Sequence, residues 1–180
     1  MNTYIAILRG INVSGKNMIK MPALIKTVEG MGYKNVKTYV QSGNVIFQSE
    51  LTNTEDLEKQ IYEQIEKDFG TKIPVIILKS DLISKIQRSN PFIKMKDIDL
   101  TKLHITFLSE EPNKDNIVKI EPAKYMPDEF IFDSKVIYLY CPGGYGTTKL
   151  NNTFFENKLK VSATTRNWNT VNKLVELTNY

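Results

Sequence analysis

A glycine-containing loop directly after a predicted strand is the first stretch that suggests chemistry. Residues 10–17 read GINVSGKN and fit the G-x4-G-K part of a nucleotide-binding loop. Asn17 stands where such a loop needs Ser or Thr for Mg²⁺, and Pro22 indicates that the next helix starts too late. These departures disfavour an NTPase. Two interpretations of the loop stay open. In one, its backbone N–H groups surround an anion whose charge Arg9 or Lys16 neutralises; in the other, the glycines only allow the chain to turn.

A second glycine loop covers residues 142–149, with the sequence PGGYGTTK, and follows the third strand of the second half of the chain. We expect the first and third strands of each half to be parallel neighbours, so that the loops leaving both emerge at the same end of a sheet. Ligand sites of strand–helix architectures favour that end. Lys149 and two threonines add a cation and hydroxyl groups to the backbone donors. A tight connection without a ligand is the alternative.

The third stretch is TTRNWNT at residues 164–170, where a short strand is predicted to turn into the final helix. Thr165 or Asn167 can cap this helix, which places Arg166 beside the positive end of the helix dipole. A cation is unfavourable there unless an anion is also bound, so Arg166 joins the candidate site. Trp168 shares a helical stripe with two valines and is expected in the core rather than as a stacking platform for bases.

No set of residues indicates a particular reaction. His104 is the only histidine, and no carboxylate can be assigned that would orient it as a general base. Cys141 is the only cysteine and ends an apolar strand, so it is expected to be buried and inert. A single histidine and a single cysteine exclude a Cys/His zinc site and an internal disulfide, and neither a metal nor a cofactor is expected. Whether the chain is an enzyme stays open.

The positive charge is concentrated in the first part of the chain. The 180 residues carry a net charge of +4, yet residues 1–49 alone hold six basic side chains and one acidic one. Such a cluster favours an anionic partner, a phosphate-bearing small molecule or a nucleic acid, although a solvated lysine-rich face would look the same. No apolar run approaches membrane-spanning length and no signal peptide precedes the first strand, so we expect a cytoplasmic protein without a membrane partner.

Apolar periodicity predicts the order β-α-β-β-α-β twice along the chain. This order is that of a ferredoxin-like, split-βαβ unit with an antiparallel sheet. We therefore expect an α+β protein with two ferredoxin-like halves, residues 1–79 and residues 80–180, the second with a connecting helix and an extra C-terminal helix. The expected strands are residues 4–8, 36–41, 44–48, 73–78, 103–108, 129–132, 136–141 and 160–163. The expected helices are residues 21–31, 54–69, 80–87, 113–120, 151–159 and 167–177.

Four motifs stand out when the whole chain is considered together. They are RGINV-x-GKN at residues 9–17, KM at residues 20–21, Y-x-QSGNVIF at residues 39–47 and AT-x-RNW-x-TV at residues 163–171. Together they resemble the bacterial family catalogued as domain of unknown function 1697. Family members usually have S-K-L after the second glycine loop, where this chain has Thr148-Lys149-Leu150 and retains the hydroxyl. The resemblance implies a small cytosolic α+β protein of ferredoxin-like units, and it implies no activity.

The preferred hypothesis is a binding module for a phosphate-bearing ligand, a nucleotide or a nucleic acid. Both glycine loops and the start of the final helix would then meet at one cleft. The candidate ligand-binding residues are Arg9, Asn12, Gly15, Lys16, Asn17, Gln41, Asn44, Gly144, Gly146, Lys149, Arg166 and Asn167. One alternative is an enzyme acting on an anionic metabolite. Another is a structural or self-associating protein, a monomer or weak homodimer, in which these residues hold loops together through hydrogen bonds.

Overall fold

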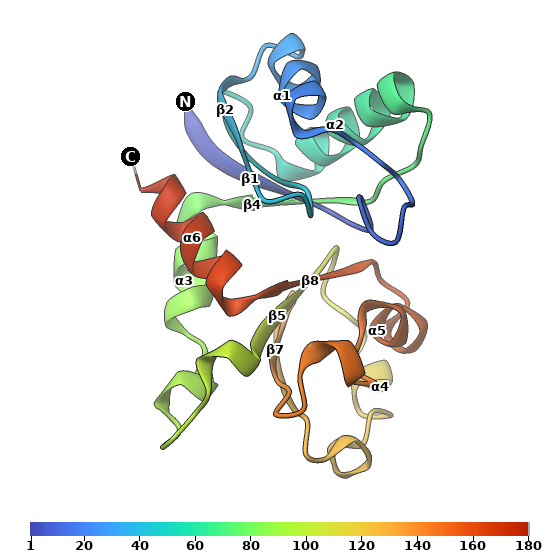
Figure 1. The fold of residues 1–180 in the computed structure, drawn as a ribbon, viewed down its shortest axis with the longest axis vertical. Coiled ribbons are helices and arrows are strands. Elements are labelled where there is room, and N and C mark those ends of the chain that lie inside the picture. The colour runs from blue at the N-terminus through green and yellow to red at the C-terminus, as the bar shows by residue number, and fades with distance from the viewer. Residues whose placement is uncertain (180) are drawn as a thin grey trace. The chain divides into compact units, whose positions relative to one another are not determined.

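The computed structural model describes residues 1–179, which form two compact units (Figure 1). The first unit contains residues 1–84 and 174–179, and the second contains residues 85–173. Each unit is built around a four-stranded antiparallel sheet. The predicted α+β class, with two ferredoxin-like halves and a C-terminal helix, is confirmed.

The elements of the first unit are, in chain order, β1 (Asn2–Leu8), α1 (Met21–Gly30), β2 (Lys34–Tyr39), β3 (Asn44–Ser49), α2 (Thr54–Phe69) and β4 (Val75–Lys79). Helix α3 (Ser80–Arg88) continues into the second unit, which contains β5 (Leu103–Leu108), α4 (Lys114–Ile117), β6 (Glu129–Asp133), β7 (Val136–Tyr140), α5 (Asn152–Leu159) and β8 (Ala163–Asn167). The final helix is α6 (Trp168–Thr178), and its last turns belong to the first unit. Short 3-10 helices lie in the connections: η1 (Pro91–Lys94), η2 (Leu100–Lys102), η3 (Pro122–Tyr125) and η4 (Tyr145–Thr147). Within the described part of the chain, no helix has the length and apolarity needed to cross a membrane.

Helices α1 and α2 cover one face of the first sheet (Figure 1). Along α2, Leu57, Ile61 and Ile65 recur at helical spacing and form a buried stripe. This stripe belongs to the same core cluster as the strand side chains Tyr4 and Phe47, whose rings stack at a centroid distance of 5.7 Å. The period of apolar residues therefore decides which side of the helix faces the sheet.

Both ends of α2 are set by local sequence. The Asn53 side chain accepts a hydrogen bond from the Glu55 N–H at 2.9 Å and so caps the helix. Gly70 ends it with a φ of 68°, in the left-handed region that glycine enters at little cost. Gly70 also begins the segment that leads into β4, so the cap determines where the next strand enters the sheet.

The strand order is β2-β3-β1-β4 in the first sheet and β6-β7-β5-β8 in the second. The central pairs β1–β3 and β5–β7 are antiparallel, so the expectation of parallel first and third strands is wrong. Each strand–helix–strand crossover preserves the strand direction and the hairpin reverses it once, which makes the third strand run against the first. As a consequence, the loop after β1 shares its end of the sheet with the β2–β3 turn.

The last strand starts three residues later than predicted. The sequence predicts a strand over residues 160–163, but β8 begins only at Ala163. Lys160 has a φ of 61° and ends α5, so the chain can extend only beyond it. Thr164, whose branched side chain suits a strand, pairs with β5 instead of forming a turn. The helix predicted over residues 113–120 is also shorter, because α4 comprises a single turn.

Candidate functional site

Three loops meet at the same end of the first sheet. They are the β1 loop (residues 9–20), the hairpin turn (residues 40–43) and the β4 loop (residues 70–74). Backbone hydrogen bonds join them: the Leu8 N–H donates to the Gly43 carbonyl at 2.8 Å, and the Arg9 N–H donates to the Pro74 carbonyl at 2.9 Å. The antiparallel strand order brings these three loops together, since β3 and β4 both enter the sheet where β1 leaves it.

The tip of the β1 loop is a two-residue turn and lacks the geometry of a G-x4-G-K phosphate-binding loop, which leads directly into a helix. Val13 and Lys16 form an antiparallel bridge, in which the Lys16 N–H donates to the Val13 carbonyl at 2.9 Å. Between them, Ser14 and Gly15 have φ values of 50° and 74°, in the left-handed region that tight hairpin turns use at both positions. Helix α1 begins only at Met21, so the turn does not present a helix N-terminus to a phosphate.

Asn12 holds the β1 loop together with both ends of its amide. Its Nδ2 donates to the carbonyl oxygens of Ile19 at 2.9 Å and Gln41 at 2.8 Å, and its Oδ1 accepts from the Ile19 N–H at 2.8 Å. Asn12 has a φ of 54°, which asparagine tolerates better than most residues. These contacts account for an asparagine at this position without a ligand, and Gln41 takes part through its backbone carbonyl.

Asn17 and Asn44 serve the neighbouring loops in a similar way. The Asn17 Nδ2 donates to the Gly10 carbonyl at 3.0 Å, and its Oδ1 accepts from the Thr71 hydroxyl at 2.9 Å, which joins the β1 and β4 loops. Asn44 is fully buried, and its Nδ2 donates to the Tyr39 carbonyl at 2.9 Å inside the hairpin. The three asparagines thus hold the loops of this end of the sheet together through hydrogen bonds.

An open pocket of about 460 Å³ lies between the β1 loop and the β4 loop, and we call it the loop pocket. Arg9 and Lys16 line it from the β1 loop, and Lys72 lines it from the β4 loop. The other lining residues are Gly10, Val13, Ser14, Asn17 and Pro74. None of the described residues that line the pocket is acidic, although the Lys72 Nζ lies 3.7 Å from the Glu66 Oε1 in an exposed ion pair. Such exposed pairs are weak, and the pocket is positively charged.

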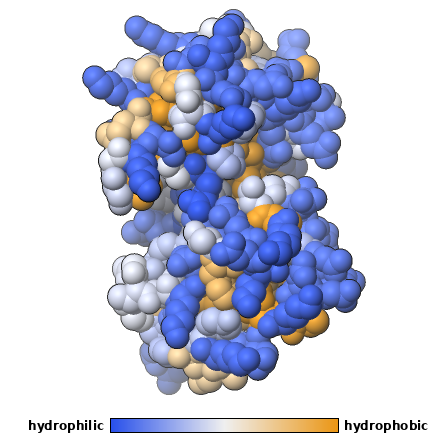
Figure 2. Space-filling model, turned by 90° about the vertical axis from the view of Figure 1, so that its right-hand side faces the viewer, coloured by the Kyte–Doolittle hydropathy of each residue, from blue (hydrophilic) through white to orange (hydrophobic). Residues whose placement is uncertain are grey.

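Lys72 is the pocket residue that sequence reasoning missed. It lies in no recognisable motif, and the only glycine of its segment, Gly70, is explained by the end of α2. The strand order supplies the missing signal, because β4 pairs antiparallel with β1 and must enter beside the β1 exit. Figure 2 shows the molecule from the side toward which the β1 loop extends in Figure 1, and hydrophilic side chains predominate on that face.

The second glycine loop is held by contacts inside the second unit. The Thr148 Oγ1 donates to the Asp128 Oδ2 at 2.6 Å, which anchors the end of the loop. Gly144 has a φ of 93°, so the backbone itself requires glycine there, and Gly146 lies in the short helix η4. Lys149 is exposed. The geometry of this loop fits a tight connection.

Arg166 and Asn167 lie at the end of β8 rather than in a turn. The Asn167 Oδ1 accepts from the Thr170 N–H at 2.8 Å and so caps α6, which selects Asn167 from the two predicted cap residues. Arg166 is buried, and its Nη1 donates to the Thr164 hydroxyl at 2.9 Å. Thr165 contacts α5 on the helix side of the sheet. Because side chains alternate along a strand, Arg166 lies on the opposite face.

The predicted ligand-binding residues are divided between the two units. Those up to Asn44 belong to the first unit, and those from Gly144 onward belong to the second.

His104 and Cys141 are both buried in the second unit. Burial raises the pKa of the Cys141 thiol to about 11, which removes the reactive thiolate near neutral pH. The His104 ring stacks on Tyr145 of the second glycine loop at a centroid distance of 4.7 Å, and burial lowers the pKa of His104 below its ordinary value of 6.5. In residues 1–179, no group of three His, Cys, Asp or Glu side chains is placed to hold a metal ion.

Acidification is expected to destabilise the second unit through His104. The pKa of His104 is lower in the folded than in the unfolded state. Its contribution to the free energy of unfolding is therefore fully present above pH 6.5, the ordinary pKa of histidine, and is lost as the pH falls from there through the folded-state pKa. Urea unfolding at about pH 7.5 and about pH 5.5 measures this loss in the wild type and in His104→Phe, which keeps an aromatic partner for Tyr145. The variant should lose less stability between the two conditions. Equal losses would assign the pH dependence to other groups.

Comparison with known proteins identifies the family. The model of the family described as "Protein of unknown function (DUF1697)" matches residues 1–138. No curated protein matches the chain significantly. A similar solved structure is that of the conserved bacterial protein SP0830 from Streptococcus pneumoniae, which is 22% identical, with a TM-score of 0.72 over 100% of this chain and 99% of that chain. At this identity the similarity concerns the fold. Because the family model covers more than half of its length, the chain belongs to the DUF1697 family of proteins of unknown function.

Proposed function

We propose that the first unit binds a phosphate-bearing ligand, a nucleotide or a nucleic acid, through its phosphate groups in the loop pocket. The observation that carries this proposal is the composition of the pocket wall. Arg9, Lys16 and Lys72 come from two separate loops and line one pocket that has no acidic lining residue. Basic side chains from two loops that face one pocket create a positive potential there, which attracts an anion.

The lining of the loop pocket also indicates what part of the ligand is recognised. Among residues 1–179, those that line the pocket include no aromatic side chain on which a base could stack. Val13 supplies a small apolar surface against which a sugar ring can pack. The turn at Ser14 and Gly15 places exposed backbone beside the cations. The loop pocket is therefore expected to recognise the phosphate groups of the ligand, whichever base they carry.

The test is the salt dependence of binding. A fluorescent single-stranded oligonucleotide is titrated with the protein at several salt concentrations, and pyrophosphate and ATP are titrated separately. Three phosphate contacts predict a slope of about −2 for log affinity against log salt, since each contact to a single strand contributes roughly −0.7. The double variant Lys16→Ala, Lys72→Ala should reduce the slope to about −0.7 and lower the affinity at least about tenfold.

The matched control is the double variant Lys26→Ala, Lys59→Ala, which removes the same charge from exposed positions on α1 and α2. Its affinity should stay close to that of the wild type. Equal losses in both double variants would show that net charge, not the loop pocket, drives binding. Absence of wild-type binding to every phosphate probe would favour the structural role that the loop asparagines already have. Phosphate release from ATP would instead support the enzyme alternative.

A further inference from the structure

We propose that β6, an outer strand of the second sheet, binds an extended segment of a partner protein that is basic at both ends and apolar between them. The segment would add a further strand to the sheet. The outer strands of the two sheets are β2, β4, β6 and β8. An outer strand presents backbone N–H and C=O groups to any chain that can pair with it, and proteins usually protect these groups. The four outer strands differ in this protection.

Strands β4 and β8 are each protected by a glutamate of the preceding helix. The Ile77 N–H of β4 donates to the Glu58 Oε1 of α2 at 2.9 Å. The Ala163 N–H of β8 donates to the Glu156 Oε1 of α5 at 3.1 Å. Because these N–H groups already have acceptors, a chain that pairs with either strand would have to displace a carboxylate.

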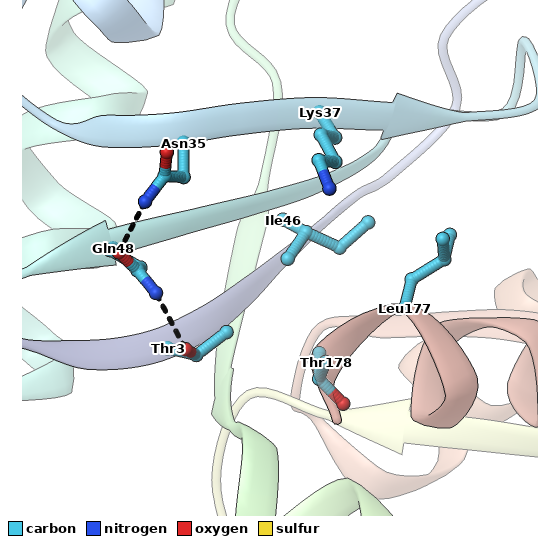
Figure 3. Close-up of a pocket in the computed structure, with 7 residues that line it drawn as sticks. All are labelled: Thr3, Asn35, Lys37, Ile46, Gln48, Leu177 and Thr178. Atoms are coloured by element: carbon cyan, nitrogen blue, oxygen red, sulfur yellow. Dashed lines mark hydrogen bonds between the residues drawn. The ribbon is translucent and has the colours of Figure 1, made fainter. Parts of the chain in front are cut away.

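Strand β2 is protected by its irregular shape. Its register with β3 shifts between Lys34 and Lys37, and Asn35 inside the shift has a φ of 52°. Figure 3 shows the Asn35 side chain turned toward Gln48 of β3, to which its Nδ2 donates at 2.6 Å. Both lysines are exposed. Irregular pairing and exposed lysines hinder the approach of a further strand.

Strand β6 has neither kind of protection. It pairs with β7 from Glu129 to Asp133 without a shift in register. In an antiparallel ladder, every second residue of an outer strand turns its N–H and C=O away from the neighbouring strand. Within residues 1–179, no other backbone or side-chain group bonds to these outward groups of β6. The outer edge of β6 is therefore regular and open to pairing.

The side chains of β6 define what an added strand would meet. Glu129, Ile131 and Asp133 point to one face of the sheet and are exposed, Ile131 by 42%. Phe130 and Phe132 point to the other face, where their rings contact α5 and stay half-buried. An added strand would thus meet an acidic–apolar–acidic row on one face and two partly covered aromatic rings on the other.

The two carboxylates select the partner. Residues directly opposite each other on neighbouring strands attract when their charges are opposite and repel when they are alike. If β6 paired antiparallel with β6 of a second copy, centred on Ile131, Glu129 would lie opposite Asp133 at both ends. Within residues 1–179, neither carboxylate takes part in an ion pair. The edge therefore disfavours a second copy and favours a segment with a basic residue opposite each carboxylate and three apolar residues between.

This proposal does not depend on the loop pocket, which belongs to the first unit. The test is a titration of the full chain, labelled with ¹⁵N, with a peptide whose core is KVIVK. In antiparallel pairing its lysines lie opposite Glu129 and Asp133, and its valines cover the phenylalanine rings. The matched control peptide has the core VKIKV, with the same composition and charge but with the lysines opposite the phenylalanines.

The KVIVK peptide should shift the backbone signals of residues 129–133. It should also slow hydrogen exchange of the β6 amides that face away from β7, because an added strand supplies their acceptors. The VKIKV peptide should do neither at equal concentration. Equal effects of the two peptides, or no change at β6 with the KVIVK peptide, would overturn the proposal.

Three variants separate pairing from charge. Ile131→Lys alters an exposed side chain, so the chain should stay folded, but binding of the KVIVK peptide should weaken about tenfold or more. The double variant Glu129→Gln, Asp133→Asn should weaken it about fivefold. The control double variant Glu29→Gln, Glu50→Gln removes the same charge from exposed positions of the first unit and should change binding less than about twofold.

Equal losses in the two double variants would show that net charge drives binding and would overturn the proposal. Sedimentation of the wild type and of Ile131→Lys completes the test. A wild-type monomer that binds the KVIVK peptide supports a basic segment of another protein as the occupant. A wild-type dimer that Ile131→Lys dissociates would instead assign the edge to a second copy and contradict the proposal.

Discussion

Gly43→Ala is expected to destabilise the first unit by about 2–5 kcal/mol. Roughly 1–2 kcal/mol comes from placing a residue with a Cβ in the left-handed backbone conformation, and roughly 1–3 kcal/mol comes from overpacking. Gly43 has a φ of +80°, and a Cβ there would lie 2.6 Å from the Ile11 Cδ1 and 2.8 Å from the Leu8 Cβ. Ile11 and Leu8 are both fully packed in the core and have little room to move. Urea unfolding followed by circular dichroism measures the change as a lower midpoint.

A second glycine separates backbone strain from the steric contact. Gly70 has a φ of +68°, but a Cβ there meets no atom within 4 Å, so Gly70→Ala should cost only about 1–2 kcal/mol. Adding Ile11→Ala to Gly43→Ala removes two of the three atoms that the new Cβ meets, the Ile11 Cδ1 and Cγ1, and leaves only the Leu8 Cβ. The double variant should therefore be less destabilised than the sum of the two single variants. Additive losses, or equal losses at Gly43 and Gly70, would contradict the predicted close contact.

Asn12→Ala is expected to cost about 2–4 kcal/mol, because it removes three hydrogen bonds that each contribute roughly 1 kcal/mol. The loss falls on the link between the β1 loop and the hairpin turn, through the carbonyl oxygens of Ile19 and Gln41. Since Arg9 and Lys16 are carried by the same loop, the variant should also bind phosphate probes more weakly than its stability alone would explain. Urea unfolding and the oligonucleotide titration measure the two effects.

Asn12→Asp is the informative companion variant. It keeps the oxygen that accepts the Ile19 N–H but loses both donations to carbonyl oxygens. Hydrogen exchange of the Ile19 amide should therefore accelerate strongly in Asn12→Ala and less in Asn12→Asp. If the Ile19 amide exchanges equally fast in the wild type and both variants, Asn12 does not hold the loop, and the residue would again be a candidate for ligand contact.

Much of the fold follows from signals within a few residues of one another. The apolar stripe of α2, its Asn53 and Gly70 caps and the glycine turn before β3 are all readable because periodicity, caps and turns depend on local backbone geometry. Repeated twice, these signals are sufficient for the ferredoxin-like order. The cap at Asn167 could also be predicted from the sequence, because it needs only a suitable polar side chain before a helix.

The candidate site depends on contacts that local signals do not contain. The direction of β3 against β1 was predicted wrongly, although it follows from the predicted order of one crossover and one hairpin. Lys72 enters the loop pocket only because β4 pairs with β1, about 70 residues away in the chain. Likewise, residue type alone did not show that Arg166 is buried in a strand.

The sequence by itself thus determined most of the elements, the α+β class and two of the three cations that line the loop pocket, Arg9 and Lys16. Only the tertiary structure decided which loops share an end of a sheet, and that the β1 loop closes into a turn held by Asn12. It also decided that the last turns of α6 join the first unit. The physical reason is the same in each case: hydrogen-bond register and side-chain packing link residues far apart in sequence, whereas propensity acts over a few neighbours.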